Sequence, residues 1–147
     1  MSSANVVVRP GTVADVAAIT TFHGWRLNGF DSYATGAAER GELLIAESGG
    51  VVSGYAMWNR SFFLRPFVSY LAVRPQSRRA GIARALLDAV EKQCRDERLF
   101  LSTNASNGPM RTLLASGGYR ECGVVDELDP GDPEVFYCKD GASANRV

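Results

Sequence analysis

Short apolar runs alternate with stretches of helical spacing from the start of the chain. The β-branched run at residues 6–8 predicts a strand. Residues 12–15, Thr-Val-Ala-Asp, match the pattern that starts a helix, and the apolar residues after them keep helical spacing. A strand therefore passes into a helix, which ends before Gly24. A second, looser stretch that is compatible with a helix follows at residues 33–40.

The middle of the chain predicts three strands and one long helix. Residues 42–47 and 51–59 are apolar runs joined by Ser48-Gly49-Gly50, and glycines supply the positive φ that a tight hairpin turn demands. Residues 66–73 form a third apolar run. Apolar side chains then recur at helical spacing over residues 82–95. We expect an antiparallel hairpin, another strand and an amphipathic helix.

The last third of the chain repeats this alternation. Residues 99–102 predict a short strand, and Asn107 and Pro109 suit the first positions of a helix. Residues 119–125 and 134–139 predict two closing strands. The whole order predicts an α+β fold with a mixed, mostly antiparallel sheet of about six or seven strands flanked by helices.

Composition sets limits on the class of protein. A chain of 147 residues with 46% hydrophobic residues suits one hydrophobic core. We therefore expect a single domain over residues 1–140 and a short tail over residues 141–147. Sixteen basic and sixteen acidic residues give a formal net charge of zero, which lacks the basic surplus of a nucleic-acid binder. The sequence thus predicts no nucleic-acid partner.

The cysteines and the N-terminus point to a protein of the cytoplasm. Cys94, Cys122 and Cys138 are odd in number and widely spaced, so neither a disulfide framework nor a metal site is expected, and the thiols should be buried or half-buried. The first residues lack the features of a targeting signal, and no apolar run reaches the length of about 18 residues that spans a bilayer. We expect no membrane partner.

The polar loop before the long helix carries the clearest chemistry. The first turn of a helix has amide N–H groups without helical partners and a partial positive charge, so it can hold a phosphate or diphosphate. Gly81 and Ala83 leave room for close approach, and Arg78 and Arg79 can add charged hydrogen bonds. The alternative is a solvated basic loop. Neither a nucleotide-hydrolysing nor a dinucleotide-binding glycine pattern is present.

At this loop the chain resembles the GNAT superfamily of N-acetyltransferases. Arg78-Arg79-Ala80-Gly81-Ile82-Ala83 is similar to the family's R/Q-x-x-G-x-G/A loop, which follows the fourth strand, here residues 68–73. Residues 107–119 resemble a later family segment that runs from an Asn to a Gly-aromatic pair. The resemblance implies transfer of an acetyl group from acetyl-CoA to a primary amine of a small molecule or peptide, by direct attack in a ternary complex.

The resemblance also implies a coenzyme site. In such enzymes the fourth and fifth strands splay apart, and the pantetheine arm of the coenzyme pairs with the main chain at positions matched here by Leu71 and Val73. The diphosphate would lie on the loop and first helical turn, which comprise Arg78, Arg79, Ala80, Gly81, Ile82 and Ala83. Asn107 matches a residue that contacts the coenzyme arm, although a helix N-cap explains it equally well.

The catalytic residues depart from the family pattern. Leu114 stands where the family's usual general acid is Tyr, and Phe67 and Ser69 occupy the fourth-strand positions where many relatives carry a base. The candidates are Ser69, through an ordered water, and Glu134, the member of the acidic segment 126–134 most expected to face inward. That segment also reads as a solvated turn. These departures leave a non-catalytic acyl-CoA-binding or sensing domain as the alternative function.

Three further questions stay open at the level of sequence. His23 is a base, part of the acceptor wall, or simply a packed or surface residue. A group of aromatic side chains belongs either to the core or to an apolar acceptor cleft. Its members are Tyr55, Trp58, Phe62, Phe63 and Phe67. A homodimer also stays open, since dimers are the commonest closed assembly.

Overall fold

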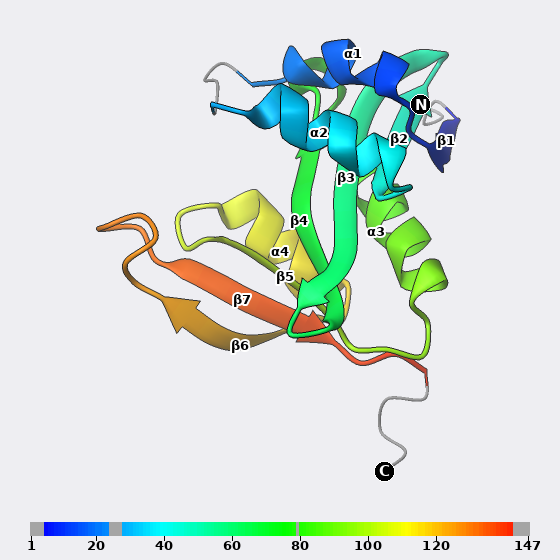
Figure 1. Cartoon of the computed structure of the whole chain (residues 1–147). Coiled ribbons are helices and arrows are strands. Elements are labelled where there is room, and N and C mark those ends of the chain that lie inside the picture. The colour runs from blue at the N-terminus through cyan, green and yellow to red at the C-terminus, as the bar shows by residue number, and fades with distance from the viewer. Residues whose placement is uncertain (1–4, 24–27, 79, 143–147) are drawn as a thin grey trace. The chain divides into compact units, whose positions relative to one another are not determined.

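Seven strands form one mixed sheet in the described part of the chain, residues 5–23, 28–78 and 80–142 of a computed structural model (Figure 1). The strand order is β1-β2-β3-β4-β5-β7-β6. The strands are β1 (Val6–Pro10), β2 (Leu43–Ser48), β3 (Val51–Phe62), β4 (Arg65–Val73), β5 (Leu99–Asn104), β6 (Arg120–Val125) and β7 (Glu134–Lys139). The helices are η1 (Val13–Asp15), α1 (Val16–Thr20), α2 (Phe30–Glu39), η2 (Pro75–Ser77), α3 (Ile82–Gln93) and α4 (Gly108–Ser116). The α+β prediction is confirmed.

The chain divides into two compact units. Unit 1 comprises Met1–Trp58 and Tyr70–Val90, and unit 2 comprises Asn59–Ser69 and Glu91–Val147. The division passes through β3, β4 and α3, so each of these elements contributes to both units. The expected single domain over residues 1–140 stays a prediction. Of the expected tail, residues 143–147 lie outside the described residues.

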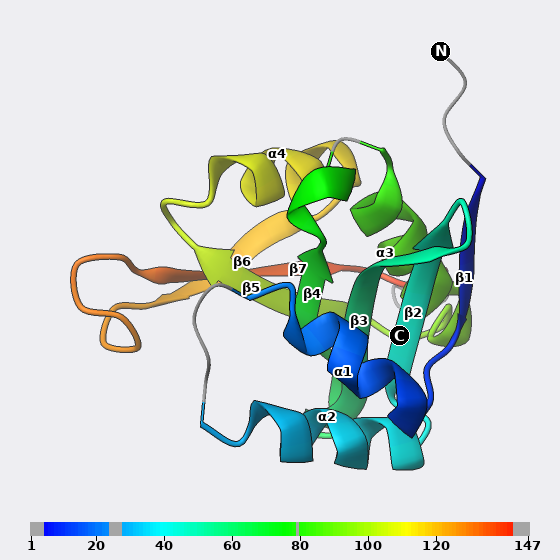
Figure 2. The ribbon, with the colours of Figure 1, turned by 90° about the horizontal axis from the view of Figure 1, so that it is seen from above.

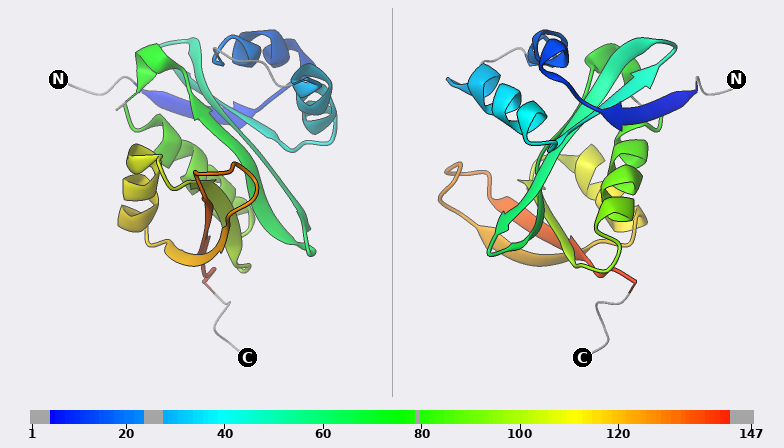
Figure 3. Two further views of the ribbon diagram at one scale, coloured as in Figure 1. Left: turned by 90° about the vertical axis from the view of Figure 1, so that its left-hand side faces the viewer. Right: turned by 45° about the vertical axis from the view of Figure 1, so that its right-hand side comes forward.

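Helices cover both faces of the strands in unit 1. On one face, α1 and α2 lie side by side and bury a core with β2 and β3 (Figure 2). Tyr55 belongs to this core and is fully buried. Gly54, which directly precedes Tyr55 on β3, faces α3 on the other side of the strands (Figure 3). A Cβ at Gly54 would stand 2.6 Å from Cγ2 of Ile82, so the glycine permits the close packing of α3.

The sheet of unit 2 has two different faces. β5 pairs antiparallel with β7, and β6 pairs antiparallel with β7. Leu99 and Leu101 are buried on the α4 side, where Nε of Arg111 donates to the hydroxyl of Tyr137 at 2.9 Å. Figure 3 shows α4 to one side of these strands. Phe100 lies on the opposite face, because successive side chains of a strand alternate.

The parallel pair of strands in unit 2 is the place where the resemblance puts the splay. β4 and β5 pair in parallel, with Phe67 opposite Phe100 and Val68 opposite Leu101. Antiparallel pairing joins β1 with β2, β2 with β3, β5 with β7, and β6 with β7. The sheet is therefore mixed and mostly antiparallel, as the sequence predicts.

The N-terminal helix begins as predicted but is short. The amide of Thr12 donates to Oδ2 of Asp15 at 2.8 Å, as the capping pattern requires. The predicted helix is split into η1 and the five-residue α1. The second helix is longer than predicted, because Phe30 enters its first turn and packs into the core.

The burial of the cysteines differs from the prediction at one position. The sequence predicts buried or half-buried thiols, but Cys122 is exposed because all of β6 is exposed. Cys94 and Cys138 are buried as expected. In the described part of the chain, no helix is long and apolar enough to cross a membrane.

Candidate active site

The loop after β4 is anchored to β3 within unit 1. The amide of Arg74 donates to the carbonyl of Ser53 at 2.8 Å. The guanidinium of Arg74 reaches forward and donates to Oγ of Ser77 from Nη2 at 2.8 Å and from Nε at 3.1 Å. The amide of Ser77 in turn donates to the carbonyl of Arg74 at 2.8 Å. These bonds fix the direction in which the chain leaves β4 for the predicted anion-binding turn.

Gly81 shapes the start of α3. Its φ is +78°, a left-handed conformation that side chains other than glycine rarely adopt. A Cβ built there would have no atom within 4 Å, so the turn is open on this side. The amide of Ala85 donates to the carbonyl of Gly81 at 3.0 Å and closes the first helical turn. The amides of Ile82 and Ala83 thus precede the helical ladder and have no carbonyl four residues back in the helix.

Most side chains around this turn are small or buried, so its main-chain amides are the candidate anion-binding groups. Ile82 is 1% exposed and packs toward Gly54, so it can contact a ligand through its main chain alone. Ala80 and Ala83 are half-buried, and neither has a side chain beyond a methyl group. Arg78 is exposed and can offer its guanidinium to phosphate oxygens. Arg79 lies outside the described residues.

The remaining predicted coenzyme contacts fall in both units. Leu71 and Val73 are half-buried residues at the end of β4, in unit 1 with the anion-binding turn. Asn107 lies in unit 2 and is the N-cap of α4, with Oδ1 accepting from the amide of Met110 at 3.2 Å. The cap role of Asn107 is therefore confirmed, whereas its coenzyme contact stays a prediction.

Both catalytic candidates lie in unit 2. Glu134 is half-buried at the start of β7, where Oε2 accepts a hydrogen bond from Oγ of Ser102 at 2.8 Å. Ser69 is exposed on β4, on the same face as Phe67 by strand alternation. Leu114, at the position of the family's usual acid, is fully buried on α4. Ser102 could not be identified from the sequence, because its bond to Glu134 depends on the pairing of β5 with β7.

The acidic segment is held by neutral hydrogen-bond donors. Nδ2 of Asn104 donates to Oδ2 of Asp129 at 2.9 Å. The hydroxyl of Ser106 donates to Oδ2 of Asp132 at 2.6 Å, and the amide of Ser106 donates to Oδ1 at 3.0 Å. Residues 126–131 are exposed, so the segment is a solvated turn between β6 and β7, which these bonds hold at Asp129 and Asp132.

His23 is packed in unit 1 against aromatic side chains. Its Nε2 lies 2.6 Å from the hydroxyl of Tyr55, and its ring meets that of Phe30 edge to face at 5.2 Å. Burial lowers the pKa of His23, and burial also raises the pKa of Tyr55. In the neutral tautomer that is protonated at Nδ1, Nε2 of His23 accepts from the Tyr55 hydroxyl. His23 is therefore a packed residue, which is one of the possibilities that the sequence leaves open.

Tyr119 is a structural residue. It is 5% exposed, and its hydroxyl donates to Oε2 of Glu91 at 2.7 Å. Nζ of Lys139 donates to Oε1 of the same carboxylate at 3.0 Å and stands 5.5 Å from the centre of the Tyr119 ring. Through Glu91, these bonds connect the end of α3 with Tyr119 and with β7 within unit 2.

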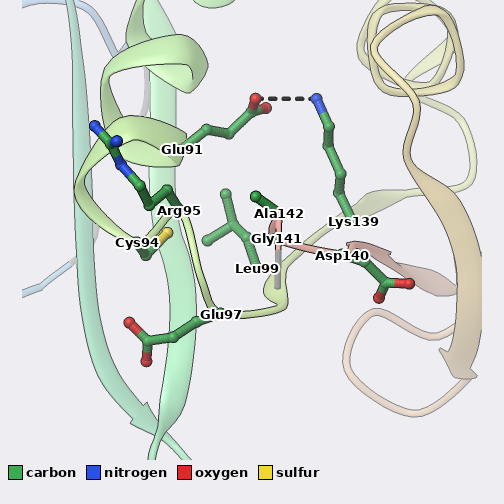
Figure 4. Close-up of a pocket in the computed structure, with 9 residues that line it drawn as sticks. All are labelled: Glu91, Cys94, Arg95, Glu97, Leu99, Lys139, Asp140, Gly141 and Ala142. Carbon is green, nitrogen blue, oxygen red and sulfur yellow. Dashed lines mark hydrogen bonds and ion pairs between the residues drawn. The ribbon is translucent and has the colours of Figure 1, made fainter. Parts of the chain in front are cut away.

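A pocket of about 230 Å³ in unit 2 lies beside this contact (Figure 4). Its charged side chains are largely engaged by protein groups: Glu97 pairs with Arg60 at 2.7 Å, and Asp140 pairs with Arg98 at 2.6 Å. Burial raises the pKa of the Cys94 thiol to about 11, which keeps it protonated at neutral pH. We assign this pocket a structural role.

The mixed sheet, its parallel β4–β5 pair and its flanking helices have the architecture that the resemblance implies. The sequence model of the acetyltransferase (GNAT) family matches residues 15–119. The chain therefore belongs to the GNAT acetyltransferase family. No curated protein is similar enough in sequence to count as a match.

Solved structures share this fold over nearly the whole chain. A GNAT-family acetyltransferase of Bacillus cereus ATCC 10987 is 25% identical, with a TM-score of 0.83 over 93% of this chain and 98% of that one. The ribosomal-protein-S18-alanine N-acetyltransferase of Escherichia coli is 19% identical, with a TM-score of 0.79 over 97% and 99%. Diaminobutyrate acetyltransferase EctA of Paenibacillus lautus, solved with L-2,4-diaminobutyric acid and coenzyme A, is 23% identical, with a TM-score of 0.77 over 98% and 99%.

Proposed function

We propose that the protein is an N-acetyltransferase that moves an acetyl group from acetyl-CoA to a primary amine of a small molecule or peptide, by direct attack in a ternary complex. The observation that carries the proposal is the open turn at Gly81, which precedes the first amides of α3 and lies in the loop that resembles the family's coenzyme loop. The relatives from Escherichia coli and Paenibacillus lautus, whose names state amine substrates, support the same chemistry.

The residues at the start of α3 suit a diphosphate. The amides of Gly81, Ile82 and Ala83 donate hydrogen bonds, while the helix dipole and the guanidinium groups of Arg78 and Arg79 balance the charge. The main chain of Leu71 and Val73 pairs with the pantetheine arm, and Asn107 contacts that arm besides capping α4. The bound coenzyme supplies a thioester carbonyl that an amine can attack.

The chain's own residues must also handle a proton. An alkylamine with a pKa of about 10.4 is almost wholly protonated at pH 7, and only the neutral form is a nucleophile. Glu134, held by Ser102, accepts this proton directly or through a water ordered by Ser69. Since Leu114 replaces the usual acid, water protonates the departing thiolate, whose conjugate thiol has a pKa of about 8.5.

A non-catalytic acyl-CoA-binding or sensing domain is the second candidate. The observation that favours it is Leu114, which is fully buried and offers no proton at the position of the family's acid. This candidate predicts coenzyme binding without turnover for every amine tested.

Two measurements separate these functions. Titration calorimetry with acetyl-CoA should show saturable binding, and absence of binding up to millimolar concentration would reject both candidates. Release of the coenzyme thiol, followed with a panel of primary amines, should show an amine-dependent rate that rises with pH as the acceptor loses its proton. Tight binding with no thiol release across the panel would instead support the sensing domain.

A further inference from the structure

Four phenylalanines form a continuous aromatic surface on one face of the unit 2 sheet. The ring of Phe62 lies 4.9 Å from that of Phe67, 5.3 Å from that of Phe100 and 6.0 Å from that of Phe136. Phe67 and Phe136 are 6.1 Å apart. All four are half-buried, so none of them is fully enclosed by the protein. We call this surface the aromatic face.

The aromatic face lies opposite the side of the sheet that α4 covers. Phe100 stands between the buried Leu99 and Leu101, and Phe136 stands between the buried Val135 and Tyr137. Strand alternation therefore directs the phenylalanines away from α4. By contrast, Trp58 is 7% exposed and belongs to the core.

A carboxylate borders the aromatic face. Glu134 precedes Phe136 by two residues on β7, so both side chains leave the strand on the same face. Ser102 lies directly opposite Phe136 in the register, and its hydroxyl donates to Oε2 of Glu134 at 2.8 Å. The carboxylate is thus fixed beside the rings.

The charge at this border is negative, and no ion pair between described residues balances it. Among the ion pairs between described residues, none includes Glu134 or a carboxylate of the segment 126–132. An aromatic surface next to a carboxylate suits a cation with an apolar body, because ring faces and the carboxylate both attract the cation while the rings bury the body. A neutral apolar ligand or a purely polar amine would use one half of the site.

We propose that the aromatic face with Glu134 binds the acceptor, and that the acceptor is a primary amine carrying an aromatic or other large apolar group close to the ammonium. The inference rests on the proposed N-acetyltransferase function, because the bound amine is an acceptor only if an acetyl group is transferred to it. The binding itself needs no coenzyme and can be measured without it.

The direct experiment compares three matched probes on the intact protein without coenzyme: 2-phenylethylamine, ethanolamine and 2-phenylethanol. The first has charge and ring, the second only charge, and the third only the ring. Titrations followed by NMR should show 2-phenylethylamine binding about tenfold more tightly than either other probe, with shifts of the phenylalanine resonances. Equal affinity for the three probes, or shifts elsewhere alone, would overturn the proposal.

Two variants locate the site, and each has a matched control. Glu134→Gln keeps an oxygen for Ser102 but removes the charge, so the affinity for 2-phenylethylamine should fall to that of 2-phenylethanol. Asp88→Asn, which removes an exposed carboxylate from α3, should leave the affinity unchanged. Phe136→Leu should weaken binding of both ring-bearing probes, whereas Val7→Ser, at a side chain 55% exposed on β1, should not. Unaltered binding in Glu134→Gln would overturn the proposal even if Phe136→Leu failed to fold.

Thiol release separates this inference from the proposed function. Tight and selective binding of 2-phenylethylamine without acetyl transfer would refute the proposed function and leave the binding site standing. Transfer to ethanolamine and 2-phenylethylamine with equal kcat/KM would support the function and refute the inference. A change of oligomeric state in Phe136→Leu, with no selective amine binding by the wild type, would mean that the face meets a second copy of the chain instead.

Discussion

At the scale of single residues, Gly81 bears most directly on coenzyme binding. Gly81→Val places a side chain in the open space of the turn and opposes φ of +78°, at a backbone cost of about 1–2 kcal/mol. We expect the affinity for acetyl-CoA to fall about tenfold or more, as measured by calorimetry, because the side chain occupies the approach to the amides. Gly49→Val is the matched control: Gly49 also has positive φ, +60°, with open space around it, but lies in the β2–β3 turn. Equal affinity in the two variants would contradict the account of the turn.

Asp15 gives a prediction about stability and pH. Arg9 donates to both of its carboxylate oxygens, at 2.8 and 2.9 Å, and this hydrogen bonding lowers the pKa of Asp15 from 3.8 to about 2. With a side chain only 11% exposed, the lowered pKa corresponds to about 2 kcal/mol of stability. Because the folded-state pKa is the lower one, this stability is present above pH 4 and is lost as the pH falls toward 2.

Urea denaturation of Asp15→Asn tests this statement. The variant should unfold with about 2 kcal/mol less free energy than the wild type at pH 7, and the difference should shrink as the pH falls from 4 to 2. Asp88→Asn, at an exposed carboxylate, should unfold like the wild type throughout. If the loss of unfolding free energy in Asp15→Asn stayed constant down to pH 2, the ion pair with Arg9 would not be the cause of that loss.

Individual site residues were predictable to different degrees. The turn around Gly81 was predictable because a glycine, two arginines and a helix start fall within one short loop. The role of Ser102 was not, because its bond to Glu134 depends on the register of β5 against β7. The same register determines that Phe100 and Phe136 share a face, so the aromatic face emerges only from the paired strands.

At the scale of elements, α4 allows the cap role of Asn107 to be separated from coenzyme contact. Asn107→Ser keeps a side-chain oxygen for the amide of Met110 and should retain stability, whereas Asn107→Ala should lose about 1 kcal/mol. If Asn107 also contacts the coenzyme, both variants bind acetyl-CoA more weakly, as calorimetry beside thermal unfolding would show. Wild-type affinity in Asn107→Ser would restrict Asn107 to capping.

Most elements follow from local pattern, and the differences have local causes. The hairpin of β2 and β3 follows from two apolar runs around Gly49 and Gly50, both of which have positive φ. β3 extends to Phe62, beyond the predicted residue 59, so the polar residues Asn59, Arg60 and Ser61 also belong to the strand. The turn that follows holds Phe63 and Leu64 at positive φ, which no local propensity predicts.

At the scale of the whole molecule, the class of fold was predictable but its division into units was not. The order of strands and helices is enough to predict a mixed sheet flanked by helices, because it depends on local patterns. The two units divide within β3, β4 and α3, and no break in composition marks those positions. Such a division arises from long-range packing, which a single sequence does not display.

Ligand binding should act on the stability of the folded chain as a whole. A ligand that binds the native state alone stabilises it by about 2.7 kcal/mol at a concentration one hundred times its Kd. Acetyl-CoA should therefore raise the Tm of the wild type in a concentration-dependent way and raise that of Gly81→Val much less. An equal rise in both proteins would place the coenzyme away from the turn.

The proposed function depends on binding of the acetyl-CoA diphosphate by the amides that open α3. A crystal structure of the protein with coenzyme A tests it most directly. Diphosphate oxygens should lie within hydrogen-bond distance of the amides of Gly81, Ile82 and Ala83. A complex in which the diphosphate lies elsewhere, with this turn unoccupied, would contradict the account.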